Sequence, residues 1–262
     1  IIGARPDLRR RWRSIWRDAP VAFPFAPWTA RRIEALLGPR DGPTHVLPCP
    51  FDAQSRMAPR VVGPVFRTAF HMRYARRKNA DGLIRAVARA AKAVPDIRLE
   101  ILGGGDPGAF AALARLAARR APERCRFLGA VSNARIQDLF NASCAVALVS
   151  HRESYGMVYA EALLAGAPAL HARGWGFDGF FPDGEATLAA PSRDEAAIAE
   201  ALIRLAREEK QFKARLAALA EAGALDRFRK EAIAALYRDA LVEAAAVPAV
   251  NGHFAGNDAA HG

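Results

Sequence analysis

Several common sequence features are scarce or missing in these 262 residues, and each absence excludes a class of protein. The chain has three cysteines and no Cys-x-x-Cys pair, so we expect no disulfide framework and a reducing, cytoplasmic compartment. No apolar run approaches the roughly 18 residues that a membrane-spanning helix requires. The first residue is Ile, and arginines soon interrupt any signal peptide, so we expect a piece of a longer chain.

Two catalytic signatures are also missing. The chain has no Asp-x-Asp, the carboxylate pair that commonly clamps a divalent ion on a nucleotide sugar. It has no Gly-x-Ser-x-Gly, the usual sign of a serine nucleophile in a hydrolase. His71 and His171 end predicted strands, but no other ligand type lies near either of them at metal-binding spacing. We therefore expect neither a metal ion nor another cofactor.

The net charge of +11 is concentrated near the amino terminus. Residues 1–50 contribute +5 and residues 51–80 contribute +6, whereas the rest of the chain is balanced. A nucleic-acid-binding protein usually spreads its basic surface further, so we expect no nucleic-acid partner. Leu8, Trp12 and Ile15 lie among arginines in a pattern that fits a basic amphipathic helix on a membrane surface. The same pattern also fits a helix of an incomplete domain.

From residue 67 onward, predicted strands and helices alternate. The expected strands are 68–72, 98–102, 125–128, 145–149, 169–171 and 186–189, and the expected helices are 81–94, 109–120, 134–142, 157–165 and 194–207. The sequence Ser-Arg-Asp-Glu at 192–195 has the spacing of a capping box and predicts a helix start there. This alternation predicts an α/β fold with right-handed crossovers and a doubly wound parallel sheet.

The remaining segments indicate a second, incomplete unit and a tail. Residues 1–50 hold two short strand candidates (21–25 and 44–47) and a helix (29–37), which cannot close a core alone. Residues 51–66 contain prolines and are interpreted as a linker, followed by a main domain at 67–225. Two further helices are expected at 212–222 and 227–246, and residues 247–262 are expected to be a disordered tail.

Ligands of an open parallel sheet bind at the carboxyl ends of its strands. Small, flexible or charged residues follow the predicted strands here, at 73–79, 103–106, 129–133, 150–156 and 172–178. They fit a cleft for an anionic, hydroxyl-rich ligand. Simpler explanations also exist, because the glycines at 103–105 fit a tight turn and Arg76, Arg77 and Lys78 fit a solvated loop.

Glu153 and Glu161, eight residues apart, are the leading candidates for a site. Spacing alone proves little, because Glu200 and Glu208 share it on a charged helix that we interpret as a solvated face. Glu153, in contrast, follows a predicted strand, and Ser-Tyr-Gly at 154–156 opens a helix whose unpaired N–H groups suit a phosphate. A carboxylate can accept hydrogen bonds from two sugar hydroxyls, so the pair suits a hexose or a ribose.

The segment ESYGMVYAEALLAGAP at 153–168 resembles the E-x7-E signature of family 4 retaining glycosyltransferases. The loop from Arg73 through Lys78 to Asn79 and the strand ends at 102–105 and 127–131 match the same family, in order. These enzymes have the GT-B fold, in which two Rossmann-like domains face each other across a cleft. The resemblance covers most of the chain after residue 66.

The resemblance implies that the chain is mainly the carboxyl-terminal, donor-binding domain of a GT-B enzyme. Residues 1–50 would be a remnant of a second Rossmann-like domain, the amino-terminal acceptor domain. The helix at 226–246 would pack back onto that domain. The chain by itself is then expected to bind a donor without transferring its sugar.

The family also implies a role for each matched residue. Arg73 and Lys78 would neutralise the leaving diphosphate, Glu153 would hold the donor sugar, and Glu161 would bind the ribose. The implied catalytic residues are Glu153, Arg73 and Lys78, and the implied substrate-binding residues are Ser154, Tyr155, Gly156, Glu161, Gly104, Gly129 and Ser132.

The implied activity is transfer of a hexose from a nucleoside diphosphate sugar to an unknown glycan or lipid-linked acceptor, with retention and without metal. Two alternatives stay open: a binding module without turnover, and attachment to the inner face of a membrane. The sequence departs from the family at Met72, where a glycine is usual, and at His171–Gly176, where a glycine pair is usual. The shape of the sugar pocket therefore stays open.

Overall fold

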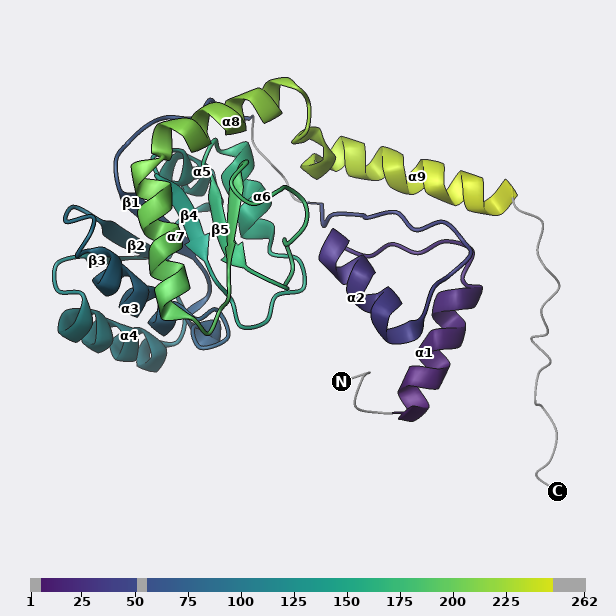
Figure 1. Cartoon of the computed structure of the whole chain (residues 1–262), viewed down its shortest axis with the longest axis horizontal. Helices are drawn as coiled ribbons and strands as arrows, with labels where there is room; N and C mark the ends of the chain where they lie inside the picture. The colour runs from purple at the N-terminus through teal and green to yellow at the C-terminus, as the bar shows by residue number, and fades with distance from the viewer. Residues whose placement is uncertain (1–5, 51–55, 247–262) are drawn as a thin grey trace.

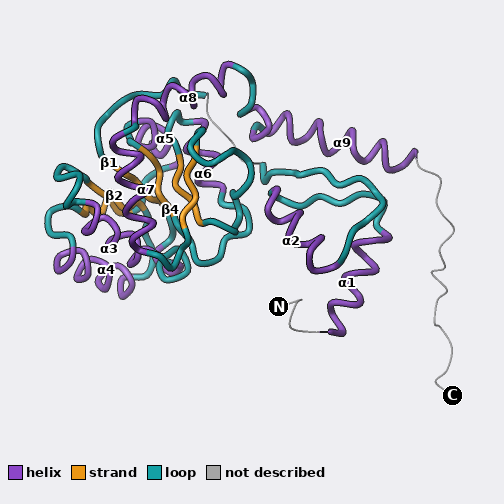
Figure 2. Tube along the Cα trace, viewed as in Figure 1, coloured by secondary structure: helices purple, strands orange, loops and turns teal. Residues whose placement is uncertain are grey.

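The computed structural model describes residues 6–50 and 56–246, so the tail predicted at 247–262 lies outside the described residues. Its main unit is a parallel sheet with helices on both faces (Figures 1 and 2). The six strands are β1 (Val65–Ala69), β2 (Arg98–Leu102), β3 (Cys125–Gly129), β4 (Ala145–Leu148), β5 (Ala169–Ala172) and β6 (Thr187–Ala190). Their order is β3-β2-β1-β4-β5-β6, which confirms the predicted doubly wound α/β fold.

Helices cover both faces of the sheet, so its central strands are buried on both sides (Figure 1). On one face lie α3 (Ala80–Ala90), α4 (Pro107–Arg120) and α7 (Glu195–Arg207), and on the other lie α5 (Asn133–Asn141) and α6 (Met157–Leu164). Residues of β4 alternate between two apolar clusters, because Ala145 and Ala147 face one side and Val146 faces the other. β4 is therefore apolar throughout, and β5 is apolar except for the buried His171.

The first strand lies three residues earlier than predicted. It starts at Val65, inside the expected linker, because the carbonyl of Pro64 already accepts a ladder hydrogen bond from Arg98. The regular strand ends at Ala69, although the amides of Phe70 and Met72 still donate to the carbonyls of Leu102 and Gly104. The chain then forms the short 3-10 helix η2 (Met72–Tyr74). The predicted strand at 68–72 was therefore wrong in its second half.

The start of α7 also differs from the capping-box prediction. Asp194 is the N-cap, and its Oδ1 accepts a hydrogen bond from the amide of Ala197 at 2.9 Å. Ser192 lies outside the helix, and its hydroxyl lies 3.2 Å from Nδ1 of His151. The helix was thus predicted correctly to within one residue, but Asp194 rather than Ser192 caps it.

Residues before the main unit form two helices, α1 (Pro6–Asp18) and α2 (Pro27–Leu37), and little strand. Of the two strand candidates, only a parallel bridge between Ala22 and Thr44 forms. Pro24 has no N–H and so cannot donate to a longer ladder.

Two of the five arginines of α1, Arg9 and Arg13, have a structural role. Arg9, Arg13 and Trp16 donate side-chain hydrogen bonds to the last carbonyls of α2, those of residues 36–38. These carbonyls have no partner within their own helix, so the α1 side chains cap α2. Trp12 and Ile15 of the same helix are exposed.

After the sheet come α8 (Glu209–Glu221), the short helix η3 (Asp226–Phe228) and α9 (Lys230–Ala246). In Figure 1, α9 runs away from the sheet and over the segment that holds α1 and α2. Tyr237 of α9 packs on Phe23, with ring centroids 5.1 Å apart. Oε2 of Glu243, also on α9, lies 3.8 Å from Nε2 of His45. None of the helices within residues 6–50 and 56–246 is long and apolar enough to cross a membrane.

Two buried charges of α8 fix this helix against the sheet. Glu209 accepts hydrogen bonds from the amides of Val62 and Gly63, at 2.8 and 2.9 Å. Lys213 donates to the carbonyls of Ser143 and Gly166, and burial lowers the pKa of its ammonium group to about 8. These contacts hold the segment before β1 in place.

Candidate active site

An ion pair lies at the centre of the carboxyl edge of the sheet. Lys78 follows β1 and Glu153 follows β4, the two neighbouring strands between which the direction of strand order reverses. Nζ of Lys78 lies 2.5 Å from Oε2 of Glu153, and the two side chains are only 15% and 11% exposed. Doubly wound sheets bind their ligands at this switch point, so the pair occupies the position where a ligand is expected.

Glycines enclose the side chain of Glu153. A Cβ atom built on Gly176 would lie 2.8 Å from Cγ of Glu153 and 2.7 Å from the carbonyl oxygen of Tyr155. Gly156, which has a φ of 89°, approaches the same Cγ from the start of α6. The loop after β5 therefore touches the loop after β4, and a side chain at 176 would displace Glu153.

The helix α6 begins beside this carboxylate without a side-chain cap. Gly156 is its N-cap residue and offers no side-chain hydrogen bond to the first N–H groups. Unpaired donors and the helix dipole make this end favourable for an anion. The ring of Tyr155 is buried against Phe177 and Phe180, and burial raises the pKa of its hydroxyl. The side chain of Tyr155 is thus part of the core, and only its backbone is available to a ligand.

Glu161 lies one turn further along α6 and is half-buried. Burial raises the pKa of its carboxyl group, because removal from water disfavours the charged form. Glu200 is exposed on α7, and Glu208 pairs with Arg204 at 3.1 Å at the end of the same helix. Glu200 is therefore solvated as predicted, whereas Glu208 is half-buried at the junction of α7 and α8.

Three predicted binding residues lie further along the edge, after β2 and β3. Gly129 ends β3, and Ser132 is the N-cap of the helix α5 that follows it. In the sheet, β3 is three strands away from β4, a distance of roughly 14 Å. Gly104 packs on Ala130, with its carbonyl accepting a hydrogen bond from the amide of Met72 at 2.9 Å. The structure therefore does not bring these residues into contact with Glu153.

The other two glycines of the run at 103–105 allow close packing of the backbone against neighbouring residues. Gly103 and Gly105 have positive φ, and a Cβ on either would collide with Phe70 or His71. Together with Gly108 they have the Gly-x-Gly-x-x-Gly spacing of a dinucleotide-binding loop, but these contacts account for the first two glycines without a ligand.

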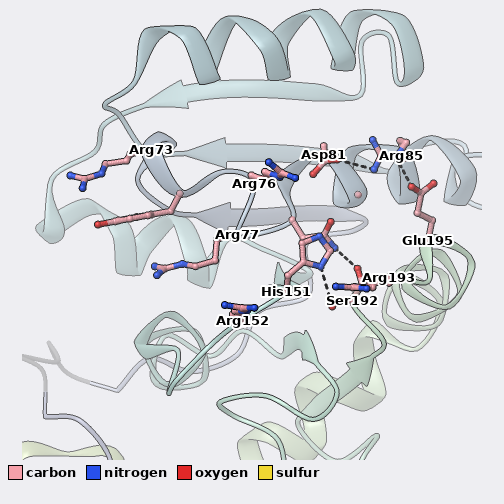
Figure 3. Close-up of a pocket in the computed structure, with 13 residues that line it drawn as sticks. Arg73, Arg76, Arg77, Asp81, Arg85, His151, Arg152, Ser192, Arg193 and Glu195 are labelled. Carbon is pink, nitrogen blue, oxygen red and sulfur yellow. Dashed lines mark hydrogen bonds and ion pairs between the residues drawn. The ribbon is translucent and has the colours of Figure 1, made fainter. Parts of the chain in front are cut away.

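Arg73 lies on η2 and is exposed, with its guanidinium 5.6 Å from the centre of the Tyr74 ring. It lines a hollow of about 870 Å³, which we call the arginine pocket (Figure 3). The lining residues are Arg73, Tyr74, Arg76, Arg77, Asn79, Asp81, Gly82, Arg85, His151, Arg152, Ser192, Arg193 and Glu195. The side chains of Arg73 and Arg77 point to the same side of the pocket in this view.

Asn79 joins three loops beneath this pocket. Its Nδ2 donates to the carbonyl of Val149 after β4, at 3.1 Å, and to that of Ser192 after β6, at 2.7 Å. The residue is 3% exposed and has a φ of 55°, a left-handed conformation that asparagine tolerates. The loop after β6 reaches this place because α7 crosses back over the sheet to pack beside α3.

The amino-terminal segment touches the same edge of the sheet. Trp28 of α2 lies against Trp175 of the loop after β5, with ring centroids 5.3 Å apart. Thr29 donates its hydroxyl hydrogen to the carbonyl of Ser154 at 3.5 Å. The segment therefore faces the loops that hold Glu153.

Sequence reasoning missed several residues of this edge. Gly176, Trp175 and Ser192 were not singled out as site residues, and Arg76 and Arg77 were interpreted as a solvated loop. The signal that could have found the arginines is their recurrence after three different strands, at 76–77, 152 and 193. The contacts of Gly176 depend on the fold of a loop without regular structure and leave no such pattern.

Comparison with known proteins places the chain in a family. Residues 65–223 match the family model described as glycosyl transferases group 1. The chain is 33% identical over 147 residues to a phosphatidyl-myo-inositol mannosyltransferase of Mycobacterium leprae, covering 56% of this chain and 38% of the relative. It is 33% identical over 211 residues to a D-inositol 3-phosphate glycosyltransferase of Xylanimonas cellulosilytica, covering 77% and 49%. The chain thus matches at most about half the length of these relatives.

Solved structures show the same fold. The Anabaena protein HepE in complex with UDP superimposes with a TM-score of 0.73 at 21% identity, over 90% of this chain and 68% of that chain. Sucrose-phosphate synthase from Thermosynechococcus elongatus superimposes with a TM-score of 0.65 at 22% identity, over 91% and 63%. These likenesses confirm the GT-B fold, and with the family match over most of the sheet they show that the chain belongs to the glycosyl transferases of group 1.

Proposed function

We propose that this chain binds a nucleoside diphosphate sugar as the donor half of a retaining hexosyltransferase. The observation that carries the proposal is the Lys78–Glu153 ion pair, which spans the switch point beside the uncapped start of α6. An ammonium group suits a phosphate, a carboxylate suits sugar hydroxyls, and a helix start suits a second phosphate. These three groups match the chemical parts of a nucleotide sugar.

In the proposed complex, the donor replaces the contact between Lys78 and Glu153. Lys78 turns to the diphosphate together with Arg73, and Glu153 accepts hydrogen bonds from sugar hydroxyls. As the glycosidic bond breaks, negative charge accumulates on the leaving diphosphate. The two cations then stabilise the transition state more than the ground state, which is what accelerates the reaction. We propose that they take the place of a metal ion.

Glu161 is proposed to bind the ribose. Its half-buried carboxyl group has a raised pKa because burial disfavours its charge. Hydrogen bonds from two ribose hydroxyls would favour the charged form again. Ligand binding and ionisation of Glu161 are therefore coupled in this proposal.

A panel of four variants tests these roles, with UDP as the first probe because HepE was solved with it. Glu153→Gln should abolish donor turnover by the full-length protein and leave UDP affinity nearly unchanged. Glu161→Gln should weaken UDP binding by about 1–3 kcal/mol, the cost of an impaired hydrogen bond to a charged group. Glu200→Gln and Glu208→Gln are the matched controls, with the same chemical change on α7 or at its end. If all four variants behave alike, the proposed roles are wrong.

The relatives' greater length limits what this chain is proposed to do alone. Transfer to an acceptor is proposed for a full-length protein, and donor binding for the chain itself. The alternative is a binding module without turnover. A full-length protein that binds UDP-glucose, with no release of glucose or UDP in any acceptor extract, would favour that alternative.

A surface of α1 supports a second proposal, peripheral contact with the cytoplasmic face of a membrane. Trp12 and Ile15 are 44% and 48% exposed on a helix that carries five arginines. One relative is named a phosphatidyl-myo-inositol mannosyltransferase, which supports a lipid-linked acceptor here. Co-sedimentation with phosphatidylglycerol vesicles should be reduced in the Trp12→Ser, Ile15→Ser double variant, and equal binding by both proteins would refute the proposal.

A further inference from the structure

The arginine pocket holds more positive charge than its own carboxylates neutralise. Six arginines and two acids line it, a formal balance of +4. Both acids pair with Arg85, which contacts Asp81 at 2.9 Å and also Glu195 (Figure 3). Within the described part of the chain, the other five arginines of the pocket have no carboxylate partner. Their mutual repulsion favours a bound anion.

The arginines are held on a rigid frame. Arg77 lies over the ring of Tyr74, with its Cζ 4.4 Å from the ring centre. The carbonyl of Arg77 accepts a hydrogen bond from the amide of His151 at 2.9 Å, which joins the loops after β1 and β4. Asn79 and the contact between His151 and Ser192 add the loop after β6. The backbones of the three loops that carry these arginines are therefore fixed around one hollow, and the side chain of Arg77 is held as well, which lowers part of the entropic cost of binding.

The composition of the lining indicates the kind of anion. All of its cations are arginines, whose planar guanidinium groups bind phosphate oxygens in pairs. The hollow of about 870 Å³ adjoins a second one of about 780 Å³, with which it shares His151, Arg152, Ser192 and Arg193. The space can take a phosphorylated molecule larger than a single phosphate ion.

The pocket is adjacent to the ion pair but distinct from it. Arg77 precedes Lys78 and Arg152 precedes Glu153 in the chain, so the backbones are about 3.8 Å apart. The side chains diverge, however, because Lys78 and Glu153 are largely buried against each other whereas Arg77 and Arg152 are exposed. The pocket and the ion pair therefore have no side chain in common.

We propose that Arg76, Arg77, Arg152 and Arg193 bind a phosphate group that does not belong to the donor. The ligand is a phosphorylated small molecule or the headgroup of a phospholipid, which share this chemistry. The proposal needs neither Glu153 nor Glu161. Arg73 also lines the pocket but is proposed to contact the donor diphosphate, so it belongs neither to this phosphate site nor to the test variant.

The test is a calorimetric titration with inorganic pyrophosphate, first alone and then with UDP at saturation. Arg152→Gln, Arg193→Gln is the test variant, and both residues are exposed, so folding should be preserved. Arg119→Gln, Arg120→Gln on α4 is the charge-matched control. Each arginine removed should weaken pyrophosphate binding about tenfold, the effect expected for a hydrogen bond between charged groups. UDP affinity should stay within about twofold in both variants.

The two sources of phosphate are distinguished by a second arm with phosphatidic acid vesicles. Vesicle binding that the Arg152, Arg193 variant loses and that pyrophosphate reverses would assign the site to a headgroup. Pyrophosphate binding without such vesicle binding would assign it to a soluble ligand.

The proposal is overturned if pyrophosphate does not bind the wild-type chain, or if the test and control variants lose affinity equally. It is also overturned if the test variant loses UDP affinity in parallel, since the pocket would then be part of the donor site. If UDP does not bind at all, the proposed donor site is wrong. The pyrophosphate titration without UDP still decides whether the arginine pocket binds phosphate.

Discussion

Replacing Lys78 with methionine tests whether the ion pair at the switch point is built as described. The change keeps most of the side-chain volume and leaves Glu153 without its cation. The carboxylate of Glu153 is only 11% exposed, and among the described residues its other side-chain hydrogen bond is with the hydroxyl of Ser150 at 3.4 Å. Removing one partner of a fully buried pair costs about 3–5 kcal/mol. Because both side chains retain some exposure, we expect Lys78→Met to lower the free energy of unfolding by about 2–3 kcal/mol. For a chain of this size, this corresponds to a fall in Tm of roughly 4–12 °C.

Removing the carboxylate instead of the ammonium group should lower the free energy of unfolding by less. Glu153→Gln leaves a lysine whose flexible stem can carry its ammonium group to water, so we expect about 1 kcal/mol. The double variant Lys78→Met, Glu153→Gln removes both charges and should be more stable than Lys78→Met alone. Lys78→Met should also weaken UDP binding at least tenfold, because the lysine is proposed to hold the diphosphate.

Denaturant unfolding followed by circular dichroism measures these free energies, and calorimetry measures the affinity for UDP. Arg229→Met is the matched control, because its pair with Glu231 is exposed and should contribute less than about 1 kcal/mol. A double variant no more stable than Lys78→Met would refute the reasoning, since the isolated carboxylate would then not be the source of the instability. If Lys78→Met lowers the free energy of unfolding by less than Arg229→Met does, the argument from the burial of the ion pair is refuted.

Two further predictions concern metal and pH. UDP binding should be unchanged by EDTA, because Lys78 and Arg73 are proposed to take the place of a metal ion; affinity that collapses on chelation and returns with Mg²⁺ would contradict this. His171 is 2% exposed between Tyr159 and Phe177, and burial lowers the pKa of its imidazole below 6.5. The unfolded chain then binds the proton more readily than the folded one, so stability should fall as pH falls below about 6.5, by at most about 1.4 kcal/mol per pH unit from this group. The neighbouring charges Asp178 and Asp183 oppose the shift and Arg173 supports it. His171→Phe should lose this part of the pH dependence in denaturation experiments at pH 7.5, 6.5 and 5.5, and an identical slope in both proteins would exclude His171 as its source.

The local sequence determined the elements of the main unit. Apolar runs such as that of β4, followed by helices with an apolar face such as α3, have a periodicity that the backbone geometry itself imposes. A regular alternation of this kind leaves few topologies, because crossovers between parallel strands are right-handed. The polar segments that follow the strands then place Lys78 and Glu153 on one edge of the sheet.

Errors occurred where a tertiary contact overrode a local signal. Pro64 indicated a linker, yet its carbonyl pairs with Arg98 and brings the start of β1 forward. Ser192 had the spacing of a cap, but Asp194 was the residue oriented to accept from the helix amides. In both cases residues distant in the chain, or the precise direction of a loop, decided between two locally acceptable conformations.

Tertiary structure alone decided how the charged residues are paired. Sequence indicated cations after β1 and a carboxylate after β4, but it could not show that Lys78 meets Glu153 while Arg77 and Arg152 stay without an acid. Nor could it show that Glu209 and Lys213 are buried, since both lie on a helix that looks polar. Periodicity records which face of an element is apolar, whereas the partner of a charge depends on the distance between side chains of different elements. That distance is set only when the sheet and its helices pack together.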